Sequence, residues 1–251
     1  MTQPVNKLAV AQAFGRAASH YDRHAALQRL SGEALLALAP VNPGLQLLDA
    51  GCGTGWFSRY WRQRGHQVTA LDLSAAMLQQ ARQQQAADRY ISGDIDALPI
   101  ASGSMDLVWS NLAVQWSDDL RAALHQFVRV TRPGGCVLFS TLTAGSLQEI
   151  HDAWQYLDAR PHANRFLSAA QIRAACGDLN VRLQQQSLTL HFPDALSAMR
   201  SLKGIGATHL HQGRDDTMLT RQRLAQLEQH WTRDVEGCRL TYQLMYGVIT
   251  P

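Results

Sequence analysis

A glycine-rich segment between a strand-like run and a helix-like run constrains this chain more than any other feature. Residues 45–50 form a short apolar run that leads into Asp49-Ala50-Gly51-Cys52-Gly53-Thr54-Gly55, and helical spacing follows over residues 54–64. Glycines at such a junction let the backbone turn sharply, approach a ligand closely and expose the amides of the helix N-terminus. The segment therefore predicts a ligand-binding turn at the carboxyl end of a buried strand.

The region around this turn alternates between strand-like and helix-like segments. We expect strands at 45–50, 67–73, 105–110 and 136–142, and helices at 54–64, 74–86 and 118–131, with a turn at 132–135. Ser74 is suited to cap the second of these helices. Because the alternation predicts parallel strands joined by crossover helices, the region from residue 45 to residue 142 is expected to form a doubly wound α/β sheet.

Beyond residue 142 the rhythm changes. Helices are expected at 146–157 and 168–176, and strands at 181–192 and 240–249. The piece between those strands, residues 193–239, contains two helical stretches around a glycine-containing loop at 204–213. It is too long for a simple connection and too short for an independent domain, so we expect a helical lid.

Composition and charge exclude several classes of function. The net charge is +3, and residues 1–30 account for the whole excess, with Lys7, Arg16, Arg23 and Arg29 against Asp22. The balanced remainder argues against an extended nucleic-acid face. No apolar run approaches the roughly 20 residues that span a bilayer, and the start lacks a signal pattern, so we expect a cytoplasmic protein. The four cysteines lie far apart and predict neither a metal site nor disulfides.

The acidic residues near the turn indicate which ligand it binds. Asp72 ends the next strand, where it can accept hydrogen bonds from ribose hydroxyls. The glycine spacing is G-x-G-x-G with Asp49 two residues before the first glycine, unlike the G-x-G-x-x-G turn that binds a pyrophosphate. A carboxylate there would repel a pyrophosphate but attract the ammonium and sulfonium groups of S-adenosylmethionine. A dinucleotide-dependent oxidoreductase remains an alternative.

Successive motifs resemble those of Rossmann-like S-adenosylmethionine-dependent methyltransferases. They are Asp49–Gly55, Asp72, Gly93-Asp94-Ile95, Asp106–Gln115 and Arg132-Pro133-Gly134-Gly135. The resemblance implies a seven-stranded, mostly parallel sheet whose last strand, residues 240–249, is antiparallel. It assigns Gly51 and Gly53 to the methionine part with Asp49 below it, Asp72 and Leu73 to the ribose region, Asp94 and Ile95 to the adenine, and Asn111 and Leu112 to the methionine and the acceptor channel.

The resemblance extends outside the cofactor core, over essentially the whole chain. Residues 13–21, 109–116, 160–167 and 195–214 are similar to the malonyl-acyl-carrier-protein O-methyltransferases of biotin synthesis. The family resemblance implies esterification of a malonyl carboxylate, with an acyl carrier protein as partner; coenzyme A as the natural carrier stays open. It also implies one domain over residues 1–251, with N-terminal helices over the cofactor (1–40), a cofactor-binding core (41–142) and the lid (193–239). We expect a monomer.

The residues expected to meet the substrate follow from its charge. A carboxylate is already ionised at neutral pH, so we expect neither a catalytic base nor a metal. Arg200, Lys203 and Arg214 are candidates to bind the malonyl carboxylate, although each can equally be a surface cation or dock the carrier protein. Trp116 is a candidate wall of the acceptor channel, and Tyr21 a candidate to fold over the cofactor; plain packing is the alternative for both. A methyltransferase of small molecules such as quinone precursors, or a non-catalytic binding module, remains an alternative function.

Overall fold

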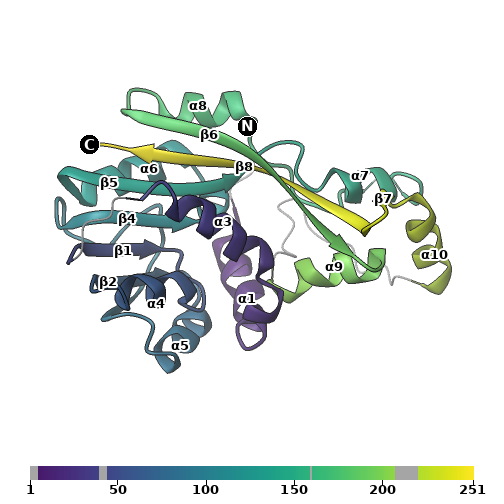
Figure 1. Cartoon of the computed structure of the whole chain (residues 1–251), viewed down its shortest axis with the longest axis horizontal. Helices are drawn as coiled ribbons and strands as arrows, with labels where there is room; N and C mark the ends of the chain where they lie inside the picture. The colour runs from purple at the N-terminus through teal and green to yellow at the C-terminus, as the bar shows by residue number, and fades with distance from the viewer. Residues whose placement is uncertain (1–4, 40–43, 159, 207–219) are drawn as a thin grey trace.

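The computed structural model describes residues 5–39, 44–158, 160–206 and 220–251, and its centre is a single sheet (Figure 1). Seven strands lie in the order β3-β2-β1-β4-β5-β8-β6, and a two-residue strand, β7 (Arg233–Asp234), pairs with β8 off this path. The seven are β1 Gln46–Ala50, β2 Gln67–Asp72, β3 Arg89–Ser92, β4 Met105–Asn111, β5 Thr131–Leu142, β6 Val181–Phe192 and β8 Gly237–Ile249.

Strands β1 to β5 run parallel, whereas β8 lies antiparallel between β5 and β6. The predicted doubly wound sheet with an antiparallel last strand is therefore confirmed. The chain leaves β1 towards β2 and β3, and later returns beside β1 as β4. The strand order thus reverses between β1 and β4, which is where open α/β sheets bind ligands.

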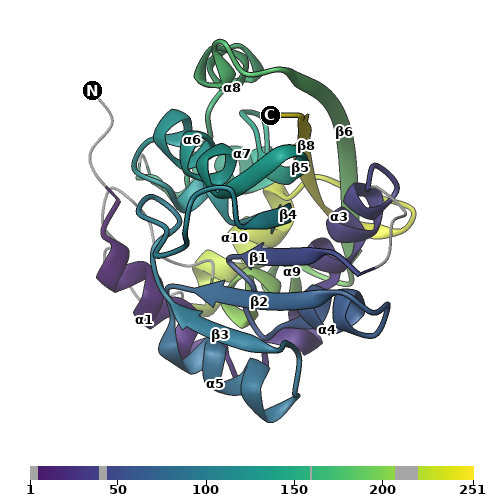
Figure 2. The same cartoon turned by 90° about the vertical axis from the view of Figure 1, so that its left-hand side faces the viewer.

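Helices cover both faces of the sheet (Figure 2). Helices α3 (Ala26–Leu36) and α4 (Trp56–Arg62) pack on one face, and α6 (Leu120–Val130) and α8 (Ala169–Cys176) on the other. Side chains alternate between faces along each strand, so Leu47 of β1 joins the first core and Leu48 the second. Asp49, two residues after Leu47, consequently faces α4.

The N-terminal helices and the helices between β6 and β8 lie at the carboxyl ends of the parallel strands (Figure 1). Helix α1 (Lys7–Ala17) packs on α5 (Ala75–Gln83), and α2 (Tyr21–His24) contacts α9 (Ala195–Gly204). Strands β6 and β8 extend past the rest of the sheet, and α7 (Gln148–Trp154), α9 and α10 (Arg221–His230) gather around their far end (Figure 1). The two predicted helical stretches between residues 193 and 239 are confirmed as α9 and α10. Within the described residues, no helix is long and apolar enough to cross a membrane.

The expected elements differ from the structure mainly at their ends. The helix predicted to reach residue 86 stops at Gln83, where the chain turns through Gln85 with a φ of 50°. The turn predicted at 132–135 is instead part of β5, because the register with β4 shifts there and produces a bulge. Strand β3 was not predicted, since residues 89–92 are too few and too exposed to show an apolar run.

Candidate active site

A partly open cavity lies at the point where the strand order reverses. It brings together residues from α1, α2, the glycine turn after β1 and the segments that follow β2, β3 and β4. Most of the predicted cofactor residues line it: Tyr21, Gly51, Gly53, Asp72, Leu73, Asp94, Ile95, Asn111 and Leu112.

The glycine turn forms the floor of this cavity and explains why glycine is needed. Gly51 has a φ of 82°, and a Cβ atom there would lie 2.3 Å from the Cβ of Ala113. At Gly53, with a φ of 56°, the nearest atom to an added Cβ would be a ring atom of Tyr21, 3.9 Å away. The turn is therefore tightly packed behind Gly51 and leaves open space at Gly53, as a close approach to a ligand requires.

Asp72 fastens the turn and keeps acceptor capacity for a ligand. Its Oδ2 accepts a hydrogen bond from the Gly53 amide at 2.8 Å, and its Oδ1 accepts one from the Ser74 amide at 2.8 Å. Each carboxylate oxygen has a second lone pair that ribose hydroxyls can use. Burial raises the pKa of Asp72, and the two amide bonds oppose that effect. The residues present thus fit a nucleoside with a positively charged substituent.

Asp49 lies behind the turn and is absent from the residues that line the cavity. It is buried, and its Oδ2 accepts a hydrogen bond from the Ser58 hydroxyl of α4 at 2.5 Å. Burial raises the pKa of Asp49 to about 7, against the opposing effect of the Ser58 bond. Its predicted position below the methionine part stays a prediction, and any effect on a cofactor would act through the field of its charge.

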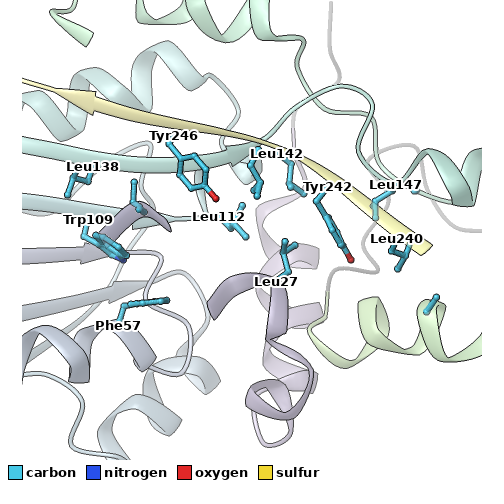
Figure 3. Packing of buried hydrophobic residues seen from close by; sticks show 14 of the residues in the cluster. Leu27, Phe57, Trp109, Leu112, Leu138, Leu142, Leu147, Leu240, Tyr242 and Tyr246 are labelled. Atoms are coloured by element: carbon cyan, nitrogen blue, oxygen red, sulfur yellow. The ribbon is translucent and has the colours of Figure 1, made fainter. Parts of the chain in front are cut away.

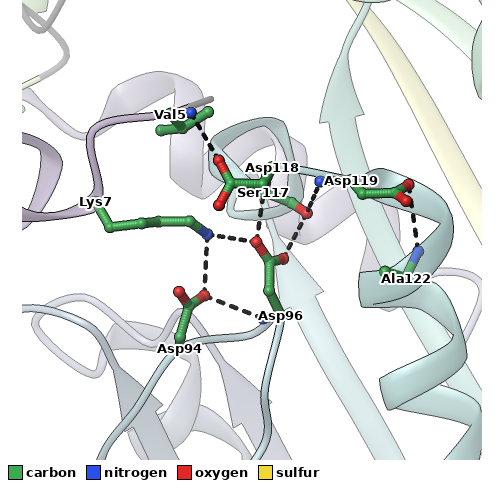
Figure 4. Close-up of polar contacts among 8 residues, drawn as sticks. All are labelled: Val5, Lys7, Asp94, Asp96, Ser117, Asp118, Asp119 and Ala122. Carbon is green, nitrogen blue, oxygen red and sulfur yellow. Dashed lines mark hydrogen bonds and ion pairs between the residues drawn. The ribbon is translucent and has the colours of Figure 1, made fainter. Parts of the chain in front are cut away.

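An ion-pair network that the sequence did not reveal lies on the side of the cavity where adenine is predicted to bind (Figure 4). Lys7 Nζ lies 3.0 Å from Asp94 Oδ1 and 2.6 Å from Asp96 Oδ2, and all three side chains are mostly buried. Asp96 also accepts hydrogen bonds from the Ser117 hydroxyl and the Asp118 amide. Lys7 thus fastens α1 to the loop that carries the predicted adenine residue, Asp94.

Tyr21, the first residue of α2, lies next to the glycine turn. Next to it, Asp22 accepts a hydrogen bond from the Thr54 hydroxyl at 2.6 Å, which ties α2 to the turn. Burial and the nearby Asp72 and Asp22 raise the pKa of Tyr21, so its hydroxyl stays protonated and can donate a hydrogen bond. The Tyr21 ring also packs against Phe14.

A second cavity adjoins the first. Both cavities are lined by Phe14, Tyr21, Leu112 and Trp116, so these residues lie at the junction. Figure 3 shows five of the residues that line the second cavity, which come from α3, the segment after β4, the end of β5, the start of α7 and β8: Leu27, Leu112, Leu142, Leu147 and Tyr242. We call this second space the acceptor cavity.

Two strained residues line the acceptor cavity. Leu112 and Leu147 have φ angles of 53° and 60°, in the left-handed region that side chains other than glycine rarely adopt. The Leu112 amide donates to the Ser140 hydroxyl at 3.0 Å, which helps to hold this conformation. Strain of about 1–3 kcal/mol per residue is typically retained at functional sites.

The structure places the predicted substrate residues in different settings. Trp116 lines both cavities and contacts Phe14 edge to face. Arg200 and Lys203 lie on α9 with exposed side chains, and neither is among the residues that line the acceptor cavity. Arg214 lies outside the described residues. Their roles in binding malonate or docking a carrier protein stay predictions.

Much of the acceptor cavity was not predicted from the sequence. Leu27, Gln28, Leu142, Leu147 and Tyr242 come from distant elements and carry no motif. By contrast, His162, Ala163, Asn164 and Phe166 belong to the stretch 160–167, whose family resemblance could have indicated a role in the site.

Comparisons with known proteins agree with this architecture. A methyltransferase-domain family model matches residues 48–139. The malonyl-[acyl-carrier protein] O-methyltransferase of Erwinia pyrifoliae is 60% identical over 249 residues, covering 99% of this chain and 95% of the relative. The chain belongs to the malonyl-[acyl-carrier protein] O-methyltransferase family. The relative of the same name from Salmonella typhimurium is 56% identical and covers 98% of each chain.

A solved structure extends the comparison to the fold. A methyltransferase of Haloferax volcanii, in complex with the Trm112 methyltransferase activator, has a TM-score of 0.59 at 25% identity and covers 98% of each chain. This chain is therefore a methyltransferase whose cofactor is S-adenosylmethionine, and the predictions of enzyme class and cofactor are confirmed.

Proposed function

We propose that this chain transfers the methyl group of S-adenosylmethionine to the free carboxylate of malonyl-acyl carrier protein, as an early step of biotin synthesis. The observation that carries the acceptor is the 60% identity, over 99% of the chain, with a relative named for this reaction. The two joined cavities support it, because one suits a nucleoside and the other leads away from it past Tyr21, Leu112 and Trp116.

The residues at the junction can promote methyl transfer by position alone. When bound, S-adenosylmethionine supplies a methyl group activated by a positive sulfonium. Tyr21, Phe14 and Trp116 confine the entry to the cofactor cavity, so they restrict the direction from which a carboxylate oxygen arrives. Good orientation of the reactants can lower the activation barrier by about 7–11 kcal/mol. The acceptor carboxylate is already ionised and therefore requires no general base. Tyr21, whose raised pKa keeps it protonated, can donate to the acceptor or to the cofactor carboxylate.

One observation favours a second candidate, a small-molecule methyltransferase of the quinone-precursor type. The acceptor cavity is walled mostly by apolar side chains, and the exposed Arg200 and Lys203 do not line it. An apolar wall suits an aromatic acceptor as well as it suits an acyl chain. The high identity with relatives named for malonyl-acyl carrier protein outweighs this observation.

The deciding experiment measures methyl transfer from labelled S-adenosylmethionine to a panel of acceptors. Malonyl-acyl carrier protein is compared with its acetyl and succinyl counterparts, malonyl-coenzyme A and a quinone precursor. Rapid transfer to the malonyl protein, with none to the acetyl protein, is expected. Transfer to the quinone precursor alone would refute the proposal. Light scattering of the same sample tests the proposed monomer.

A further inference from the structure

We infer that His162 is the specificity-determining residue that supplies the positive charge for the malonyl carboxylate in the acceptor cavity; the inference rests on the proposed function. A malonyl group differs from an acetyl group by its carboxylate, so an enzyme that selects it needs a hydrogen-bond donor or a cation there. The predicted cations Arg200 and Lys203 do not line the cavity. Among the described residues, this charge must therefore come from one that lines the acceptor cavity.

His162 is the one described lining residue that can become cationic near neutral pH. The other polar side chains of the wall are the amides of Gln28, Gln115 and Asn164 and the hydroxyls of Tyr21 and Tyr242. Burial raises the pKa of both tyrosines, so they remain neutral. Imidazole is the side chain that ordinarily gains a proton between pH 5 and 8.

Contacts on two sides fix the His162 ring. Nε2 lies 2.6 Å from Asp158 Oδ1, and the ring stacks on Trp154 with centroids 3.5 Å apart and planes 11° from parallel. Asp158 also pairs with Arg223 of α10 and accepts a hydrogen bond from the Arg160 amide. The pKa of Asp158 is lowered by these bonds, so a carboxylate faces the ring.

This arrangement leaves Nδ1 as the ring nitrogen that a substrate can reach. Because Nε2 is bonded to Asp158, any hydrogen bond from the ring to a substrate must come from Nδ1. With Nε2 already protonated, Nδ1 carries a proton only in the imidazolium form. Binding of an anion by His162 therefore requires the charged ring, and the Asp158 carboxylate and the Trp154 ring face lie against it. Other charged or titratable groups lie nearby. Arg223 pairs with Asp158, and His151 interacts electrostatically with His162, Arg165 and Asp152.

The test compares His162→Gln and Asp158→Asn with a matched control, His230→Gln. His230 lies on α10 and stacks on Tyr156 with centroids 3.9 Å apart, but it does not line the acceptor cavity. We expect His162→Gln to raise KM for malonyl-acyl carrier protein about 10- to 100-fold, as loss of a charge-assisted hydrogen bond does. The turnover number and the Kd for S-adenosylmethionine should change less than about threefold, because the cofactor cavity is untouched.

The pH profile separates this role from a merely structural one. In the wild type, kcat/KM should fall as the pH rises through the range in which an imidazole loses its proton. His162→Gln should lack that limb, and Asp158→Asn should raise KM as well, because the carboxylate that holds Nε2 of the ring is gone. His230→Gln should keep the wild-type KM and profile.

The outcomes distinguish the two proposals. A wild-type enzyme that transfers no methyl group to malonyl-acyl carrier protein refutes the proposed function and this inference with it. An active wild type, combined with an unchanged KM or an unchanged pH limb in His162→Gln, refutes the inference alone. If His162→Gln does not fold, as judged by its Kd for S-adenosylmethionine, Asp158→Asn decides: an unchanged KM for malonyl-acyl carrier protein overturns the inference.

Discussion

Replacement of Ser58 by alanine should destabilise the protein by an amount that depends on pH. The Ser58 hydroxyl donates to the buried Asp49, whose pKa is about 7 in the folded protein against an ordinary value of 3.8. Between these values the folded state binds more protons than the unfolded chain, so wild-type stability from this group falls as the pH rises through about 7. Without Ser58 the pKa of Asp49 rises further, and the loss continues to higher pH.

The expected magnitude follows from the kind of hydrogen bond that is removed. At about pH 5.5 Asp49 is protonated in the fold, so the variant loses a neutral hydrogen bond, about 1 kcal/mol. At about pH 9 the same change removes a bond to a carboxylate, about 1.5–3 kcal/mol. The free-energy difference between wild type and variant should therefore grow by about 0.5–2 kcal/mol across this range.

Urea unfolding at both pH values measures this difference, with Ser110→Ala as the matched control. Ser110 is equally buried, but its hydroxyl donates to the neutral carbonyl oxygen of Ala50 at 2.9 Å. Its replacement should cost about 1 kcal/mol at every pH, because no charge is involved. Equal pH dependence in the two variants would show that the Asp49 carboxylate does not titrate as described.

Three further changes test the cofactor site. Gly51→Ala forces a side chain into a φ of 82° with its Cβ 2.3 Å from that of Ala113, so calorimetry should show a Kd for S-adenosylmethionine at least about tenfold higher; an unchanged Kd would contradict the tight turn. Lys7→Met removes the cation between Asp94 and Asp96, and the Kd should rise about 3- to 10-fold, an effect that would be absent if α1 did not close the cavity. Thr54→Val keeps the shape but loses the bond to Asp22, and should cost about 1 kcal/mol in thermal unfolding; a gain in stability would argue against docking of α2 through this bond.

The fold of the cofactor core could be predicted from the sequence because its local patterns agree with one another. The run before Asp49 has strand length and the glycines follow it, and Ser74 caps α5 as expected, with its hydroxyl accepting from the Met77 amide. Strand β6 was predicted with its observed ends, Val181–Phe192. Strand β3 was missed because its four residues are only partly buried, so neither hydrophobicity nor length distinguishes them from a loop.

The candidate site could be predicted where motifs at the carboxyl ends of strands supply its residues. Asp72 and Asn111 end strands of the same sheet, and Gly51, Gly53 and Asp94 lie just after strands, so their positions in the chain imply that they meet. The acceptor cavity has no such rule, because its residues come from helices and strands whose packing depends on tertiary contacts. A pairing such as Lys7 with Asp94 joins residues 87 positions apart and leaves no trace in local spacing.

Charge is separated between the two cavities in a way that matches the two reactants. Carboxylates lie in or next to the cofactor cavity, at Asp72 and Asp94 in its wall and Asp22, Asp49 and Asp96 behind it. Among the described residues that line the acceptor cavity there is no carboxylate. A positive methyl donor is thus attracted to one side, and an anionic acceptor is not repelled from the other. Because methyl transfer neutralises both charges, the apolar junction at Leu112 and Trp116 penalises the separated reactants more than the transition state, and so it favours the reaction.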